Sequence, residues 1–124
     1  MDLKGYFGGT SGRGVLATAD AQGKVDVAVF ARPHVMDDGT VGFIMPDRLT
    51  HFNLQSNPHA AYLFMEEGGG WKGVRLFLKK TREEKDTELL RSLRRRRYTD
   101  EEEGRYLVLF QVEKVLPLIG PGEE

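Results

Sequence analysis

Hydrophobic and polar residues alternate along several short segments of the chain, and this period of two predicts β-strands. Within 25–36, three valines at alternate positions share one face, whereas Phe30 and Arg32 share the other. Pro33 cannot donate a ladder hydrogen bond, so we expect this strand to be open on one side near its end. Turn residues separate the segments, and Asp38-Gly39 predicts a type I′ hairpin turn. The six predicted strands cover residues 14–19, 25–36, 41–45, 60–65, 74–84 and 106–115.

Two other segments have the three-to-four-residue spacing of apolar positions that is typical of helices. The first is expected to run from an N-cap at Asp47 to about Ser56, with Leu49 and Phe52 on one side. The second is predicted over 88–97. Its candidate caps are Asp86 and Thr87, and its apolar stripe consists of Leu89, Leu90 and Leu93.

The order of these elements, β-β-β-α-β-β-α-β, predicts a mainly β fold with flanking helices. Short turns join most of the six strands, which favours a closed or nearly closed antiparallel barrel over a parallel sheet with helical crossovers. No repeat or change in composition divides the chain, so we expect a single domain over residues 1–124. The glycine-rich residues 1–13 are expected to be flexible apart from a helical turn before Gly5, and residues 120–124 to fray.

Composition narrows the class of protein. The 124 residues contain 18 Lys and Arg against 19 Asp and Glu, a net charge of −1, so no general affinity for nucleic acid is expected. The chain contains no cysteine, which excludes disulfides, thiolate metal ligands and cysteine nucleophiles. No apolar run is long enough to cross a membrane, and the first residues lack the apolar core of a secretory signal. We therefore expect a soluble, cytoplasmic protein.

The segment 46–50, where the third strand leads into the first predicted helix, is a candidate anion-binding site. A helix N-terminus presents unpaired N–H groups and a partial positive charge, and Arg48 and Thr50 add a guanidinium and a hydroxyl. Arg32 shares a strand face with Phe30, so a planar ring along this strand would place its phosphate at the junction. The alternative is a capped surface helix with a solvated arginine, and the spacing alone leaves it open.

Other suggestive motifs have plainer explanations. The glycine-rich stretch 8–14 lacks the Gly-Lys-Ser/Thr ending of a phosphate loop and leads into a strand, which favours a loop or a lid. His34, His51 and His59 are too scattered for a zinc site, so no metal is expected. No acid and base are paired in the sequence, so no catalytic side chain is predicted and a hydrolase is not supported.

Two further features have competing interpretations. The basic run Arg94–Arg97 is followed at once by the acidic residues 100–103, so we expect a solvated helix face with ion pairs. Nucleic-acid binding is the alternative, which a steep salt dependence would reveal. Trp71 follows three glycines, and its indole either covers a ring-shaped ligand or packs on the end of the barrel.

Several stretches, taken in order, resemble the pyridoxamine 5′-phosphate oxidase-like family of FMN-binding split barrels. The resemblance extends from about Gly14 to Gly120, nearly the whole chain. Each motif is degenerate, but their order and spacing in so short a chain make the combination informative. The matching stretches are residues 14–19, 27–32, 39–44, 48–58 and 110–115.

This resemblance implies a six-stranded antiparallel split barrel that forms a homodimer with FMN at the subunit interface. The flavin ring would lie along the second and third strands, and its phosphate would lie near the start of the following helix. By resemblance, the flavin-facing strand contributes Ala28, Phe30, Ala31 and Arg32, the returning strand Ile44 and Met45, and the phosphate stretch Arg48, Leu49 and Thr50. With Trp71, these residues form the predicted cofactor site.

The chain departs from the family at two places. Family members often have a lysine, or an arginine-lysine pair, where this chain has Leu49-Thr50. The Arg-x-His of true pyridoxamine phosphate oxidases is absent near the C-terminus, which disfavours pyridoxal phosphate synthesis. The sequence therefore predicts an FMN-binding flavoprotein, an oxidoreductase of undefined substrate and redox partner. The alternative is a non-catalytic module that binds haem or F420 on the same barrel.

Overall fold

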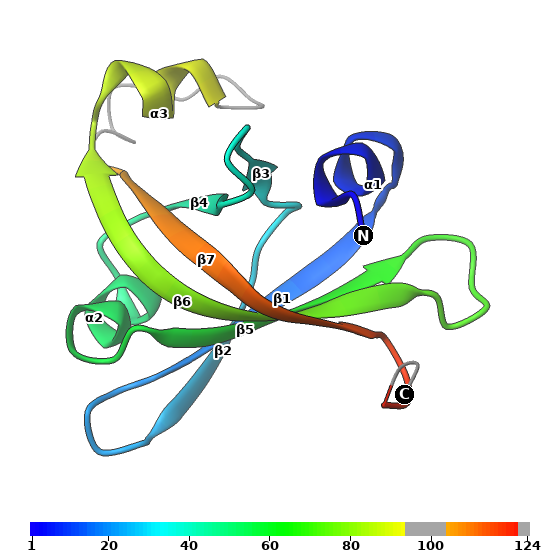
Figure 1. The fold of residues 1–124 in the computed structure, drawn as a ribbon. Coiled ribbons are helices and arrows are strands. Elements are labelled where there is room, and N and C mark those ends of the chain that lie inside the picture. Colours follow the sequence, from blue (N-terminus) through cyan, green and yellow to red (C-terminus); the bar gives the residue numbers. More distant parts are fainter. Residues whose placement is uncertain (94–103, 122–124) are drawn as a thin grey trace.

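The computed structural model describes residues 1–93 and 104–121, which form seven strands and three helices (Figure 1). The strands form one antiparallel sheet in the order β2-β1-β5-β6-β7-β4-β3. The helices are α1 (Leu3–Gly9), α2 (Leu49–Ser56) and α3 (Glu88–Leu93). The strands are β1 (Gly12–Ala19), β2 (Val25–Val29), β3 (His34–Val35), β4 (Val41–Met45), β5 (His59–Glu66), β6 (Gly73–Lys85) and β7 (Tyr106–Pro117).

The sheet curves strongly but does not close. β6 and β7 are its longest strands, and two register shifts, at Phe77/Leu78 and Lys80/Arg82, interrupt their pairing. Such bulges bend and twist a strand pair, which lets β6 and β7 sweep around the core in Figure 1. The strands β2 and β3 form the two edges of the sheet.

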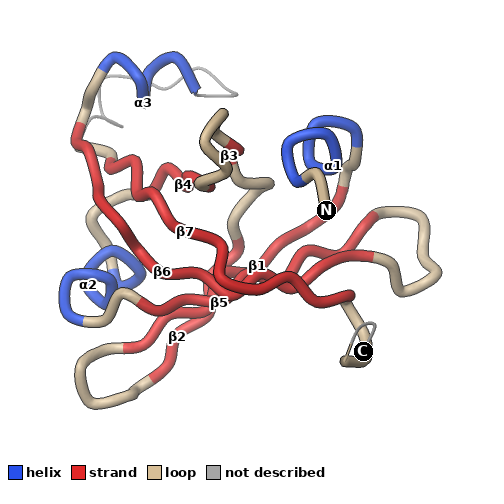
Figure 2. Tube along the Cα trace, in the orientation of Figure 1, coloured by secondary structure: helices blue, strands red, loops and turns tan. Residues whose placement is uncertain are grey.

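Both edge strands come from the segment predicted as one strand over 25–36. β2 pairs with β1, and β3 pairs with β4, so the chain passes from one edge of the sheet to the other (Figure 2). The connecting residues 30–33 include Pro33, which has no N–H to continue a ladder. The expected six-stranded barrel is thus a seven-stranded open sheet, because one predicted strand is divided in two.

The turn between β3 and β4 also differs from its prediction. A type I′ turn needs positive φ at both central residues, but of the residues in this turn only Gly39 has one, at 89°. The N–H of Gly39 donates to Met36 O at 3.0 Å, and the N–H of Met36 donates to Thr40 O at 2.8 Å. The turn is therefore type I followed by a glycine in the left-handed region, another common hairpin geometry.

The helical turn expected before Gly5 is part of a longer helix, which covers residues 3–9 and so includes residues expected to form a loop. The carboxylate of Asp2 accepts a hydrogen bond from the N–H of Gly5 at 3.1 Å, which caps the helix. Phe7 is buried, with its ring 5.2 Å from that of Phe64, centroid to centroid. Leu3 and Tyr6 pack against the same cluster, so the apolar positions do have helical spacing, and the low helix propensity of Gly5, Gly8 and Gly9 hid it in the sequence.

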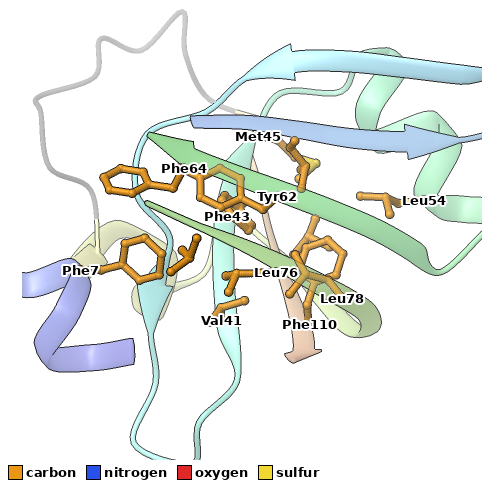
Figure 3. Close-up of a cluster of buried hydrophobic side chains, with 13 residues drawn as sticks. Phe7, Val41, Phe43, Met45, Leu54, Tyr62, Phe64, Leu76, Leu78 and Phe110 are labelled. Carbon is orange, nitrogen blue, oxygen red and sulfur yellow. The ribbon is translucent and has the colours of Figure 1, made fainter. Parts of the chain in front are cut away.

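An aromatic cluster fills the space enclosed by the sheet (Figure 3). Phe43 lies at its centre, with ring centroids 4.9 Å from Tyr62, 5.9 Å from Phe30 and 6.0 Å from Phe110. A smaller cluster of Leu90 with two leucines of β7 packs under α3. Among the described residues, no helix is long and apolar enough to cross a membrane.

The helix α2 presents an unusual face to the core. Its buried residues are Thr50, His51, Asn53 and Leu54, whereas Leu49 and Phe52 are 54% and 64% exposed. The buried polar groups are paired: the Nδ2 of Asn53, for example, donates to Oγ1 of Thr18 at 3.1 Å. Because the polar side chains of α2 find hydrogen-bond partners inside the protein, its apolar side chains point toward solvent.

One of the two predicted helices has the expected cap, and the other does not. The N-cap of α2 is Arg48, without a side-chain hydrogen bond, so the expected cap at Asp47 was wrong. Thr87 begins α3, because its Oγ1 accepts from the N–H of Leu90 at 3.3 Å. The expected extension of this helix to 97, the basic run and the acidic stretch 100–103 fall outside the described residues. So do residues 122–124 of the expected frayed tail.

Candidate functional site

A cleft of about 610 Å³ opens between the edge strand β2, the strand β4 and the start of α2. Nine of the ten residues predicted to bind a cofactor line it: Ala28, Phe30, Ala31, Arg32, Ile44, Met45, Arg48, Leu49 and Thr50. The other described lining residues are Asp26, Val29, His34, Phe43, Pro46 and Arg105. The sequence pattern and the resemblance therefore point to one continuous surface.

The strand that lines this cleft is held firmly where it leaves the sheet. The N–H of Phe30 donates to Gly14 O at 3.0 Å, and the carbonyl of Phe30 accepts from the Tyr62 hydroxyl at 3.0 Å. The carbonyl is thus tied to the aromatic cluster and the N–H to β1. These contacts place the residues after Phe30 along the cleft rather than in the sheet.

Arg32 lies toward the α1 side of the cleft. Its Nη1 donates to the carbonyl oxygens of Phe7 at 2.8 Å and Thr10 at 3.2 Å, at the C-terminal end of α1. Asp26, at the other end of the same segment, contacts Thr50 at the start of α2. Arg32 and the start of α2 therefore face different parts of any ligand that spans the cleft.

At the start of α2, a carboxylate stands beside the predicted phosphate site. The hydroxyl of Thr50 donates to Oδ2 of Asp26 at 3.4 Å. The first N–H groups of α2 have no intrahelical partner, and its N-cap makes no side-chain hydrogen bond to them. An anion at this junction is favoured by the helix and by Arg48, and is repelled by Asp26.

The charge of the cleft is predominantly positive. Its described lining holds three arginines, at 32, 48 and 105, and one carboxylate, Asp26. An excess of guanidinium groups around a concave apolar surface attracts anionic ligands. The cleft is thus suited to a molecule with an apolar body and a negatively charged end.

Sequence reasoning missed three polar residues of this lining. His34 was considered only as a zinc ligand, and Asp26 was not included in the predicted site. Arg105 was not considered at all. It reaches the cleft because Tyr106, the next residue, pairs with Met45 at the far end of β4. Only the long-range pairing of β4 with β7 brings Arg105 there.

Trp71 stands apart from the other predicted residues. It is 68% exposed and belongs to the turn that joins β5 to β6, on the opposite side of Figure 1 from α2. Its φ of 54° lies in the left-handed region. Trp71 is not among the residues that line the cleft of its own chain, and its role in covering a ligand stays a prediction.

A network of polar side chains around the buried His51 holds the start of α2 in place. Nδ1 of His51 lies 3.2 Å from Oδ1 of Asp47, and Nε2 lies 2.9 Å from Oε2 of Glu83 on β6. The imidazole also stacks on the ring of Tyr106, with 3.8 Å between centroids. These contacts tie α2 to both β6 and β7.

Glu83 is the charged centre of this network. Partial burial raises its pKa, but hydrogen bonds from Gln55, Lys80 and His51 outweigh that effect and lower the pKa to about 2. Nζ of Lys80 lies 2.5 Å from Oε1 of Glu83, and Nε2 of Gln55 lies 2.9 Å from the same oxygen. Within residues 1–93 and 104–121, no cluster of three or more His, Cys, Asp or Glu residues is arranged to hold a metal ion.

Solved structures share this architecture across most of their length. An FMN-binding protein from Syntrophomonas wolfei superposes with a TM-score of 0.77 at 17% identity, covering 96% of this chain and 85% of the other. A proposed pyridoxamine 5′-phosphate oxidase from Lactobacillus delbrueckii gives a TM-score of 0.70 at 15% identity, with coverages of 94% and 92%. An F420 reductase gives 0.69 at 13% identity, with coverages of 86% and 90%.

No protein-family model matches the chain, and no curated protein matches it. The likeness to solved structures therefore establishes the fold. The chain has the split-barrel fold of the pyridoxamine 5′-phosphate oxidase-like, flavin-binding proteins, in agreement with the resemblance of its sequence.

Proposed function

We propose that the protein is an FMN-binding flavoprotein, that it acts as an oxidoreductase, and that it works as a homodimer with the cofactor at the subunit interface. The observation that carries the proposal is the cleft, in which nine residues chosen from the sequence line one cationic, partly apolar surface. The fold is shared with an FMN-binding protein, which adds support.

The residues of the cleft fit the chemistry of FMN. A cleft of about 610 Å³ lies within the usual range for small-molecule sites. Ala28, Phe30 and Ile44 supply an apolar wall for a planar ring. Arginine guanidiniums provide charge-assisted hydrogen bonds to a phosphate monoester. Glu83 and the other groups of the buried network stay outside the cleft lining and therefore serve to position α2 rather than to contact the ligand.

When bound, the flavin would supply the redox chemistry, and the chain would orient it. Phe30, fixed through both its N–H and its carbonyl, would hold the strand against one face of the ring. Arg32 is anchored by its contacts with α1, so its guanidinium would keep a fixed position beside the ligand. The aromatic cluster behind Phe43 would exclude water from the inner side.

The outer face of the sheet supports the proposed homodimer. Side chains that pair across strands point to the same side, so Val29 lies with Val15 and Leu63, and Val27 with Ala17 and Ala61. Phe77 of β6 continues the row beside Ala61. Val25, Val27 and Val29 are 81%, 66% and 82% exposed in the single chain. Exposed apolar side chains that adjoin one another across neighbouring strands are typical of an interface.

The test is the identity of the ligand in the purified protein. We expect a yellow protein with flavin absorption bands, release of FMN on denaturation, and rebinding of added FMN with quenching of flavin fluorescence. Titrations with F420 and haem under the same conditions form the comparison. Preferential binding of either would favour the alternative cofactor-binding module, and failure to bind FMN would refute the proposal.

A further inference from the structure

Arg105 occupies a place in the cleft that the sequence did not reveal. It lines the cleft beside Pro46 and Arg48, and it directly precedes β7. The pairing of Tyr106 with Met45 brings this end of β7 next to the end of β4, from which the chain turns into α2. The cleft near the start of α2 is therefore lined by two arginines, the N-cap Arg48 and Arg105 before β7.

The backbone of Arg105 is held on both sides by one residue, Asp86, just beyond the end of β6. The N–H of Asp86 donates to the carbonyl of Arg105 at 3.1 Å, and Oδ1 of Asp86 accepts from the N–H of Arg105 at 3.1 Å. The same carboxylate accepts from the N–H of Gly104 at 3.0 Å. Asp86 therefore fixes the stem from which the Arg105 side chain extends.

Asp86 adopts a backbone conformation that side chains disfavour. Its φ is 50°, in the left-handed region, and apart from glycines only Trp71 shares this feature among the described residues. Such strain persists where surrounding contacts demand it, and it concentrates at functional sites. Here the demand comes from the three hydrogen bonds to the segment that carries Arg105.

A second set of contacts links Arg105 to Arg48. Tyr106, next to Arg105, stacks on His51, and His51 in turn contacts Asp47, next to Arg48. The two arginine-bearing segments are thus connected through one buried imidazole. The carboxylate of Asp26 on β2 accepts a hydrogen bond from the Thr50 hydroxyl. A phosphate in the cleft is repelled by this carboxylate and attracted by the two arginines.

We propose that Arg105 binds the phosphate of the ligand together with Arg48, and that Asp86 is the residue that positions Arg105. The assignment to a flavin phosphate rests on the proposed function. Arg105 takes the place of the basic residue that the family resemblance led us to expect at Leu49-Thr50. A second positive charge thus reaches the phosphate from the residue before β7 and not from Leu49-Thr50.

The test compares FMN with riboflavin, which lacks the phosphate. We expect R105Q to weaken FMN binding about 10- to 100-fold, the loss of a charge-assisted hydrogen bond, and to change riboflavin binding less than about threefold. R91Q removes the same charge from the exposed face of α3 and should leave both affinities unchanged. Equal losses for both ligands, or no loss for FMN, in R105Q would overturn the proposal.

Variants of Asp86 test separately whether this residue positions Arg105. Asparagine tolerates the left-handed region and keeps an acceptor oxygen, so D86N should retain FMN affinity within about threefold of the wild type. Glycine relieves the strain but removes the acceptor, so D86G should weaken FMN binding several-fold and leave riboflavin binding unchanged. Thermal unfolding of both variants checks that the fold is intact. Wild-type FMN affinity in a folded D86G would refute the role of Asp86.

Titration of inorganic phosphate distinguishes this proposal from the proposed function. The Arg105 Nε–Hε signal, assigned by its loss in R105Q, is followed by NMR while phosphate is added. If the wild type binds neither FMN nor riboflavin, the flavin assignment fails. A saturable shift of the Arg105 signal would then still support an anion site, whereas a constant signal would overturn it.

Discussion

At the scale of single residues, the close approach of Gly14 to Tyr62 helps to fix the strand that lines the cleft. A Cβ atom built on Gly14 would lie 1.9 Å from the Tyr62 hydroxyl oxygen. This hydroxyl donates to the carbonyl of Phe30, and Gly14 O accepts from the N–H of Phe30. Glycine is required here because β1 must leave room for the tyrosine that holds the cleft strand.

We therefore expect G14A to destabilise the fold by about 1–3 kcal/mol through overpacking. G8A is the matched control, because a Cβ on Gly8 in α1 meets no atom within 4 Å and alanine favours a helix. Urea unfolding at pH 7 measures both variants. A G14A protein as stable as G8A would contradict the proposed steric role.

The lowered pKa of Glu83 predicts how the stability of the protein responds to acid. Its folded pKa of about 2 lies below the ordinary value of 4.5, so the unfolded state binds the proton more tightly. The stabilisation is complete above about pH 4.5 and is lost as the pH falls from there through 2, on the order of 3 kcal/mol in all. We expect E83Q to be less stable at pH 7 and to lose less stability between pH 4.5 and 2.

Urea unfolding at a series of pH values checks this expectation. E67Q removes a carboxylate from the exposed turn between β5 and β6 and should follow the wild-type pH profile. If E83Q also followed the wild-type profile, the network around His51 would not be the source of acid sensitivity.

Which site residues the sequence revealed depends on how local their signals are. Arg32, Arg48 and Thr50 were found because a strand face and a helix start are short-range patterns. Arg105 and Asp86 were missed because their importance arises from pairings that join β4, β6 and β7 across the chain. No local pattern distinguishes Arg105 from a solvated arginine.

At the scale of elements, the alternation over 25–36 located the cleft strand but not its division. The N–H of Phe30 still donates to Gly14 O in the register of β1 and β2, but its carbonyl accepts from the Tyr62 side chain, so tertiary packing ends the ladder here. The helix α2 shows the same limit. Its position was predicted, but its buried face is polar, because Thr18 and Glu83 provide partners that lie far away in sequence.

The helix α1 depends on the cleft strand as well as on the core. Arg32 donates to two carbonyls at its C-terminal end, where cations are also favoured by the helix dipole. We expect R32A to increase hydrogen exchange of the α1 amides about tenfold or more, since hydrogen bonds from a charged group are lost. Mass spectrometry of deuterium uptake by the N-terminal peptide measures this.

The control for this prediction is K4A in the same helix. Lys4 forms an ion pair with Asp37, but both side chains are largely exposed, and surface pairs contribute little. K4A should therefore leave exchange of α1 unchanged. If the α1 amides exchanged equally slowly in R32A and the wild type, Arg32 would not stabilise the helix.

At the scale of the whole molecule, the open sheet has one covered and one uncovered side. Leu16, Tyr62 and Leu76 face inward and are fully buried. The neighbouring positions face outward and are largely apolar on β2, β1 and β5. The mainly β, antiparallel fold could be predicted, since turns and the sequence of strands are local features and the family resemblance extends over most of the chain, but the open sheet could not. The exposed apolar outer face follows only from the strand register.

This outer face predicts the oligomeric state. Val27 is solvent-exposed in the single chain, so V27D costs the protomer little, but a dimer across this face would bury an unpaired carboxylate. We expect the wild type to have twice the mass of the 14.0-kDa chain by light scattering and V27D to dissociate at micromolar concentration. V27T keeps the branched shape that suits a strand and should remain dimeric. A21D adds the same charge at the exposed turn between β1 and β2 and should also remain dimeric. A monomeric wild type, or a V27D protein as dimeric as V27T, would refute an interface across β2.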